Sequence, residues 1–285
     1  IKMGDFTYHL RSESIARYPA EPRGSSRLLN VEANGNVRHF DTFTDSILPL
    51  LKNAHVVFNQ SKVVNARLSV HSVGDPKRND IEMMILDLGD NLEESCEDSE
   101  LAVMIRKVGI KVGDTFVENG EGSVSFRIEK ILGPWIEGEE SNGNGTECTV
   151  RIQDKNCTVS ELLRSVGSVP IPPYLNRGAE ARDIHTYNTV YASGEGSVAA
   201  PTAGLHFDNP VLEKIGSDNI SFLSLHVGAG TFKPVMVEDA RDHKMHSENF
   251  IVSVGELQRI IRALELRKRL VVVGTTSSRT LESLY

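Results

Sequence analysis

Short apolar runs that end in polar, glycine-rich turns recur along this chain. The runs at 54–58, 220–227 and 269–274 have the length and composition of buried strands. Asn59-Gln-Ser-Lys62 follows the first run, and turns rich in glycine and hydroxyl groups follow the other two. Because the carboxyl ends of parallel strands meet at one edge of a sheet, this pattern predicts an α/β fold with its site at that edge.

Helix-start signals lie between these runs. Thr158 and Ser253 each open a capping box, and Asp208 precedes a proline near the first helical position. The first of these helices should end near Gly167. The helix after Ser253 carries four apolar residues on one face, namely Leu257, Ile260, Ile261 and Leu264.

The middle of the chain has a different pattern. Period-two alternation marks 124–128 and 148–152, and apolar runs occupy 81–88 and 101–108. A small antiparallel β-barrel fits these features. We therefore predict a mixed-sheet α/β domain (1–64 and 158–285) interrupted by an inserted β-barrel domain (65–157).

The charge of the chain is unevenly placed. The net charge is −8, but residues 85–150 hold fifteen acidic and five basic side chains, so the remainder sums to +2. The acidic runs 90–100 and 137–147 are expected to be solvated loops. An acidic total normally counts against nucleic-acid binding, and this segregation weakens that objection.

Cysteine usage and hydropathy bear on the compartment. Three cysteines without a CxxC pair indicate free thiols in a reducing environment. No run of eighteen apolar residues occurs, and the first residues lack a targeting pattern. We expect a cytoplasmic protein without a membrane partner.

Two polar turns are candidate ligand sites. Val227-Gly-Ala-Gly-Thr-Phe232 weakly resembles the glycine turn of methyltransferases, although a plain structural turn explains it equally well. The loop 274–280 is rich in hydroxyl groups, and a helix starting at Thr276 or Ser277 would offer free N–H groups to an anion. Arg279 is placed to clamp a carboxylate or phosphate.

Four of the nine histidines fall within residues 206–246. His243 and His246, with Glu248, have ligand-like spacing on an expected helix, which leaves a metal site open as an alternative. Proton transfer by one of the histidines and a plain structural role are the other two interpretations.

At these blocks the sequence resembles the S-adenosylmethionine:tRNA ribosyltransferase-isomerase family (the QueA family). The resemblance is collinear over nearly the whole chain. Its most specific blocks are Ala199-Ala-Pro-Thr-Ala-Gly-Leu-His-Phe207, His243-Lys-Met-His-Ser-Glu248 and Gly274-Thr-Thr-Ser277. Gln60-Ser61 and Asn188 depart from the family pattern, and the family usually continues beyond the point where this sequence stops.

The resemblance implies transfer and isomerisation of the ribosyl part of S-adenosylmethionine onto a 7-aminomethyl-7-deazaguanine base in tRNA. The products would be epoxyqueuosine in tRNA, adenine and methionine, with S-adenosylmethionine as substrate and no metal. The expected catalytic residues are His206, His226, His246 and Glu248. The expected S-adenosylmethionine-binding residues are Gly228, Gly230, Thr231, Thr275, Thr276, Arg279 and Asn59.

The partner implied is a tRNA with a GUN anticodon, bound by a monomer. Phosphate contacts are expected from Arg17, Arg23, Lys62, Arg67, Arg177 and Lys233. Tyr174, Tyr187 or Phe207 could stack on an unstacked base, with core packing as the equal alternative. The competing hypotheses are a shortened, non-catalytic relative that binds tRNA and S-adenosylmethionine, a Rossmann-type methyltransferase and a metal-dependent hydrolase using His243 and His246.

Overall fold

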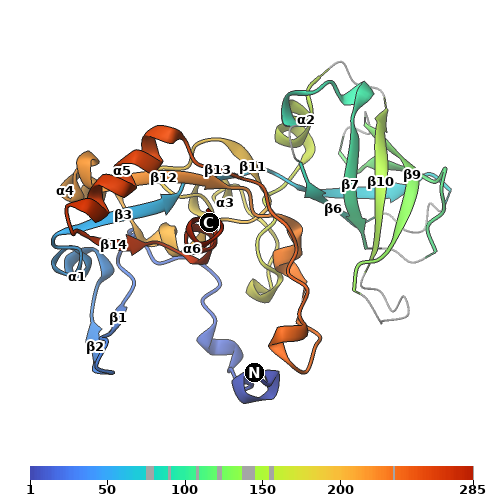
Figure 1. Cartoon of the computed structure of the whole chain (residues 1–285). Helices are drawn as coiled ribbons and strands as arrows, with labels where there is room; N and C mark the ends of the chain where they lie inside the picture. The colour runs from blue at the N-terminus through green and yellow to red at the C-terminus, as the bar shows by residue number, and fades with distance from the viewer. Residues whose placement is uncertain are drawn as a thin grey trace.

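The structure is a computed structural model that describes residues 1–74, 80–88, 91–106, 109–120, 124–136, 145–153, 157–233 and 235–284. It consists of an α/β layer and a β-barrel that lie side by side (Figure 1). This architecture confirms the predicted fold class. The exact domain boundaries at 64 and 157 stay a proposal.

A four-stranded sheet forms the centre of the α/β layer. Its order is β13 (Phe250–Ile251), β12 (Ile220–Leu225), β3 (Ala54–Asn59) and β14 (Arg269–Val272). β12 and β14 both run parallel to β3, whereas β13 is an antiparallel edge strand. The three apolar runs of the sequence are therefore the three parallel strands.

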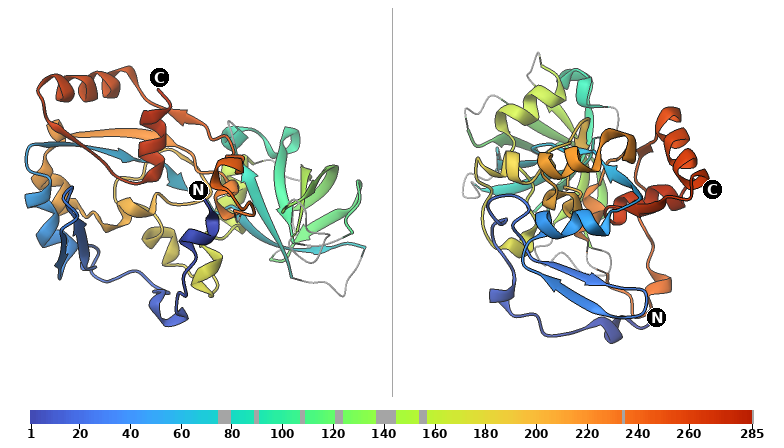
Figure 2. Two further views of the ribbon diagram at one scale, coloured as in Figure 1. Left: turned by 60° about the horizontal axis from the view of Figure 1, so that its bottom comes forward. Right: turned by 90° about the vertical axis from the view of Figure 1, so that its left-hand side faces the viewer.

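Alternate side chains of β3 point to opposite faces of the sheet. Val57 packs in a cluster with residues of α5 (Val254–Glu265) and α6 (Thr275–Glu282). Val56 and Phe58 belong to a second cluster with residues of α1 (Phe43–Leu50) and α4 (Asn209–Ile215). The sheet thus lies between two helical layers (Figure 2, left).

The helix starts follow the sequence signals, with one difference. Thr158 forms a complete capping box at α2 (Val159–Val166), and Asp208 caps α4. Ser253 caps α5, but the Glu256 carboxylate accepts from the backbone N–H of Phe222 on β12. The apolar face of α5 is only partly covered, because Ile261 and Leu264 are 47% and 52% exposed.

Six antiparallel strands close into the barrel in the order β10-β7-β6-β5-β8-β9. Their bounds are Arg67–Ser72 (β5), Ile81–Asp87 (β6), Glu100–Ile105 (β7), Thr115–Glu118 (β8), Ser125–Pro134 (β9) and Thr146–Gln153 (β10). Phe116 and Phe126 are fully buried in its interior. The alternation along 124–128 and 148–152 therefore reports the inward face of barrel strands.

The acidic run 90–100 is more than a solvated loop. It contains two short 3₁₀ helices, η3 (Asn91–Glu93) and η4 (Cys96–Asp98). Leu92 and Cys96 are buried in the barrel core, and the Sγ atoms of Cys96 and Cys157 lie 3.4 Å apart. Most of the second acidic run, 137–147, lies outside the described residues.

Short elements complete the chain. The strand pairs are β1 (Leu28–Val31) with β2 (Val37–Phe40), and β4 (Lys62–Val63) with β11 (Glu195–Ser197). The short helices are η1 (Met3–Phe6), η2 (Ser12–Ser14), η5 (Pro173–Leu175), α3 (Asp183–Thr186), η6 (Thr202–His206), η7 (Ser217–Asn219), η8 (Ala229–Phe232) and η9 (Ala240–Asp242). Among the described residues, no helix has the length and apolar character needed to span a bilayer.

Candidate active site at the strand ends

Asn59 joins the ends of the parallel strands. Its Nδ2 donates to the Leu225 carbonyl oxygen (3.0 Å) and to Thr276 Oγ1 (3.3 Å). Its Oδ1 accepts from the N–H groups of Ser61 (3.1 Å) and Leu225 (3.0 Å). A side-chain amide has two N–H donors and an oxygen with two lone pairs, and all of them are used here. The buried Asn59 therefore positions β3, β12 and α6 and has no hydrogen-bonding group left for a ligand.

His226 follows β12 and is half-buried. Its Nδ1 lies 2.7 Å from Ser61 Oγ, which fixes the orientation of the ring. Gly196 makes room for this imidazole, because a Cβ there would lie 2.8–3.1 Å from ring atoms. Burial lowers the pKa of His226, while Asp87 on the barrel strand β6 acts in the opposite direction. The ring is therefore neutral near pH 7 and can accept a proton.

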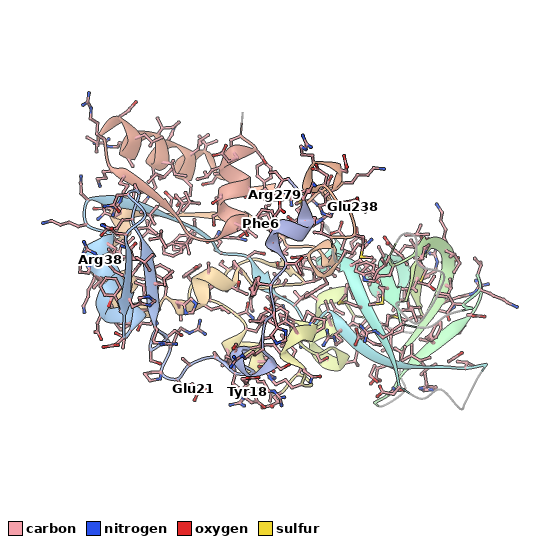
Figure 3. All side chains as sticks on the ribbon, turned by 90° about the horizontal axis from the view of Figure 1, so that it is seen from below. Phe6, Tyr18, Glu21, Arg38, Glu238 and Arg279 are labelled. Carbon is pink, nitrogen blue, oxygen red and sulfur yellow. The ribbon has the colours of Figure 1, made fainter. Side chains whose placement is uncertain are left out.

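His246, Glu248 and Arg279 form a second group beside His226. Arg279 donates from Nη1 to Glu248 Oε2 (2.5 Å) and from Nη2 to the His246 carbonyl oxygen (2.5 Å). Glu248 Oε1 accepts from the N–H of Gly228 (3.2 Å) and lies 3.3 Å from Nε2 of His246. The 3.3 Å contact lacks hydrogen-bond geometry, so this buried Nε2 is left without a hydrogen-bond partner. Figure 3 shows Arg279 on α6.

The predicted roles of the two glycines change in this structure. A Cβ at Gly230 would lie 2.6–2.8 Å from the His246 ring, so this imidazole fills the space beside the glycine. Gly228 uses its N–H on Glu248. Gly230 therefore leaves space for the His246 ring, and Gly228 binds Glu248, which lies beside that ring. Contact with S-adenosylmethionine stays a prediction.

A cavity of about 610 Å³ opens at the strand ends, and we call it the strand-end cavity. Thr231 of η8 lines one side, and Gly274, Thr275 and Thr276 at the start of α6 line another. α6 begins at Thr275, one residue earlier than the sequence indicated, with Gly274 as its N-cap at φ +87°. The first backbone N–H groups of a helix have no partner within the helix and favour an anion.

His206 lies apart from the other two histidines. It lines a separate cavity of about 820 Å³, which we call the N-terminal cavity, with its ring 5.5 Å from that of Phe43. Loss of water around the ring and the neighbouring Arg23 lower the pKa of His206. The two cavities share Pro172, Tyr174, Tyr187 and Thr202. The three histidines thus do not line one hollow, because neither His226 nor His246 is among the residues that line these two cavities.

The barrel contributes to the site from outside the sheet. Val198 and Ala229, which flank the strand ends, are buried in the barrel's core cluster. Lys233 pairs with Glu147 (3.3 Å) and lies 4.2 Å from the ring centroid of Trp135, both barrel residues. These contacts hold η8 and the glycine turn against the barrel.

Five of the six cations expected to contact RNA have partners within the protein. The Arg177 guanidinium pairs with Asp183 through two hydrogen bonds (2.7 and 2.8 Å) and is 10% exposed. The other partners are three carbonyl oxygens for Arg23, Glu195 for Lys62, the Ile171 carbonyl oxygen for Arg67 and Glu147 for Lys233. The side chain of Arg17 is exposed. RNA contact stays a prediction for all six, and Arg17 is the best placed.

The three aromatic residues expected to stack on a base differ in solvent exposure. Phe207 is 3% exposed in the core beneath the sheet, and its ring lies edge-on to those of Phe43 and Phe58, so it is a core residue. Tyr187 is 8% exposed and Tyr174 is 63% exposed. Only Tyr174 offers an open ring face to a base.

Sequence reasoning missed Ser61 as a partner of His226. Its position supplied a usable signal, because Ser61 comes two residues after β3, the strand that lies beside β12. Residues at neighbouring parallel strand ends are close in space.

The metal-site hypothesis rested on the spacing of His243 and His246 along an expected helix, and the structure has no helix there. His243 and His246 lie in a segment without regular structure between η9 and β13, so the helical spacing does not apply. Across the described residues, no three or more His, Cys, Asp or Glu side chains are grouped as metal ligands.

The fold and the site define an α/β protein with a histidine-rich site at parallel strand ends, backed by a β-barrel. A family model described as a queuosine biosynthesis protein matches residues 3–285. The chain is 36% identical over 289 residues to the S-adenosylmethionine:tRNA ribosyltransferase-isomerase of Sulfurihydrogenibium sp. (strain YO3AOP1), which covers 99% of this chain and 78% of that protein. The chain belongs to the queuosine biosynthesis protein family.

A solved structure is also similar to this chain. It is the S-adenosylmethionine tRNA ribosyltransferase of Thermotoga maritima, at 22% identity. The match covers 98% of this chain and 72% of that one, with a TM-score of 0.38.

Proposed function

We propose that this protein is an S-adenosylmethionine:tRNA ribosyltransferase-isomerase. It transfers the ribosyl part of S-adenosylmethionine to the 7-aminomethyl-7-deazaguanine base of tRNA and isomerises it, releasing adenine and methionine. The relative that covers 99% of the chain at 36% identity is the single observation that carries this proposal. The tRNA has a GUN anticodon and the enzyme acts as a monomer. The family match does not favour the metal-dependent hydrolase or the non-catalytic relative.

The strand-end cavity is the proposed place for S-adenosylmethionine. Its volume of about 610 Å³ suits a ligand of this size. The N–H groups of Thr275 and Thr276 at the start of α6 suit the methionine carboxylate. Thr231 lines the same cavity, and its hydroxyl suits a ribose hydroxyl. The sulfonium carries its own leaving group, so the proposal assigns no metal.

His226 is the proposed base for the proton beside the sulfonium, because its pKa is lowered and Ser61 holds its Nδ1. That arrangement leaves Nε2 for proton transfer. His246 is the proposed acid for departing adenine, since the Glu248 carboxylate lies 3.3 Å from its Nε2 and Arg279 holds its backbone carbonyl. General acid and base catalysis of this kind contributes roughly 10²–10⁴-fold.

Three residues act through others in this proposal. Arg279 holds Glu248 and the backbone of His246, so it positions the acid. Glu248 also fixes the glycine turn through the Gly228 N–H. Asn59 fixes the start of α6 through Thr276. Arg279 therefore replaces its predicted carboxylate-clamping role with a positioning role.

Product analysis tests the proposal. The protein is incubated with S-adenosylmethionine and tRNA carrying the deazaguanine base, and small molecules are separated. We expect adenine and methionine in equal amounts and a tRNA heavier by the transferred ribosyl group. S-adenosylhomocysteine in place of adenine would indicate a methyltransferase. Hydrolysis that requires added or bound zinc would indicate a hydrolase.

A further inference from the structure

The N-terminal cavity is not explained by a strand-end site alone. It lies between residues 15–26 and the segment that carries η5 and α3. Figure 3 labels Tyr18 and Glu21, two of its wall residues, on the N-terminal segment. Its volume of about 820 Å³ is within the range of about 300–1,000 Å³ typical of ligand sites.

The two cavities adjoin at a shared wall. Pro172, Tyr174, Tyr187 and Thr202 line both of them, so a ligand in one lies next to a ligand in the other. A group-transfer enzyme needs two substrates held in contact. We propose that the N-terminal cavity receives the unstacked 7-aminomethyl-7-deazaguanine base of the tRNA while the strand-end cavity holds S-adenosylmethionine. This inference rests on the proposed function and assigns each substrate to its own cavity.

The walls of the N-terminal cavity suit a base attached to a polynucleotide. Tyr174 is 63% exposed and presents its ring at the junction of the cavities, where a planar base can stack. The ring of Tyr18 is already covered by the guanidinium groups of Arg177 (4.4 Å) and Arg182 (4.0 Å). An aromatic ring stacks on any base and adds affinity, so the open ring of Tyr174 favours binding of an unstacked base here.

The charges of this cavity fit the same ligand. Arg17 is an exposed cation on its wall, where it meets the phosphates that flank an unstacked nucleotide. Glu21 is an exposed carboxylate on the same wall and suits the aminomethyl group, which is cationic in water. The strand-end cavity instead contains the start of α6, whose N–H groups favour a carboxylate. The assignment of substrates to cavities follows from this difference.

The covalent step places His206 beside the attacking amine. The aminomethyl nitrogen, after loss of a proton, forms a bond to the ribosyl carbon that carries adenine, as the bond between that carbon and adenine breaks. Adenine leaves with the bonding electrons and takes up a proton from His246, the proposed acid. His206 lines the N-terminal cavity and not the strand-end cavity, so it lies on the side of the amine. It is therefore a residue positioned to take the proton of the amine.

Two matched substitutions test the assignment. Ala16 lines only the N-terminal cavity and Ala203 only the strand-end cavity, and both side chains are exposed. Ala16→Trp and Ala203→Trp fill one cavity each with little effect on folding, which thermal unfolding verifies. Three dissociation constants are measured for each protein: S-adenosylmethionine, an anticodon stem-loop carrying the deazaguanine base, and the same stem-loop with guanine.

For the unsubstituted protein we expect the modified stem-loop to bind about tenfold more tightly than the guanine form, because only the modified base carries an aminomethyl group that can donate a charge-assisted hydrogen bond to Glu21. Ala16→Trp should abolish this preference and leave S-adenosylmethionine affinity within about twofold. Ala203→Trp should weaken S-adenosylmethionine binding about tenfold and keep the preference.

The opposite pattern, or an unchanged preference in Ala16→Trp, would overturn the assignment. If the unsubstituted protein still releases adenine from S-adenosylmethionine and modified tRNA, the proposed function stands and only the assignment fails. If it neither binds S-adenosylmethionine nor releases adenine, the proposed function and the assignment fail together.

Discussion

At the scale of single residues, glycines and histidines are paired. Gly196 makes room for the ring of His226, and Gly230 makes room for the ring of His246. The sequence indicated that Gly228 and Gly230 of this turn bind S-adenosylmethionine. The structure places an imidazole there, because residues 243–249 return to the strand ends without forming a helix.

Replacing Gly230 with alanine tests this pairing. The added Cβ would lie 2.6–2.8 Å from the His246 ring, so we expect the free energy of unfolding to fall by about 1–3 kcal/mol, as overpacking usually costs. Gly228→Ala is the matched control, since its nearest contact would be an ordinary 3.6 Å. Chemical denaturation measures both. Equal stabilities of the two variants would show that the ring does not fill this space.

The buried His55 should make stability depend on pH. Burial, with Arg259 and Lys268 nearby, lowers the pKa of His55 below its ordinary 6.5, with Glu256 opposing, and Nε2 lies 2.9 Å from Ser221 Oγ. The unfolded chain therefore binds the proton more readily, and the free energy of unfolding falls as pH drops below about 6.5. His55→Gln should flatten this dependence in denaturation curves from pH 5 to 8. An identical slope would exclude His55 as the source.

At the scale of elements, the parallel strands and α6 converge on one amide. Asn59 makes four hydrogen bonds that connect β3, β12 and α6. The sequence predicted the strands and their polar ends correctly, because apolar runs of this length are strongly indicative. It assigned Asn59 to the ligand, because the partners of a side chain depend on strand pairings that no local pattern specifies.

Asn59→Ala should lower the free energy of unfolding by about 3 kcal/mol or more. The substitution leaves several buried backbone groups unpaired, at roughly 1–3 kcal/mol each. Asn36→Ala, at an exposed position near β2, is the control and should change stability by less than about 0.5 kcal/mol. Urea denaturation compares them. A loss as small as the control's would mean that Asn59 does not hold the strand ends together.

At the scale of the whole molecule, the barrel supports the site and internal contacts occupy most of the predicted RNA-binding cations. The barrel could be predicted because its strands alternate clearly. The contacts between the barrel and η8 could not be predicted, and neither could the two cavities, because both depend on how distant segments of the chain pack. Arg23 and Arg177 looked like phosphate ligands in sequence, yet they hold backbone carbonyl oxygens and a buried carboxylate.

The salt dependence of tRNA binding tests which of these cations contact the RNA. We expect affinity to fall as salt rises, and Arg17→Ala should reduce the slope of log K against log salt by about one. Arg262→Ala on α5 is the control for loss of one exposed charge and should leave the slope unchanged. A slope in Arg17→Ala equal to that of the unsubstituted protein would remove Arg17 from the RNA contact.

The central claim is that the strand-end histidines carry out ribosyl transfer. The most direct test is the rate at which His226→Ala releases adenine from S-adenosylmethionine in the presence of modified tRNA. His39→Ala, on the exposed strand β2, is the control. We predict a rate at least about tenfold lower for His226→Ala with the fold intact, and an unchanged rate for His39→Ala. Equal rates for both variants would contradict the claim.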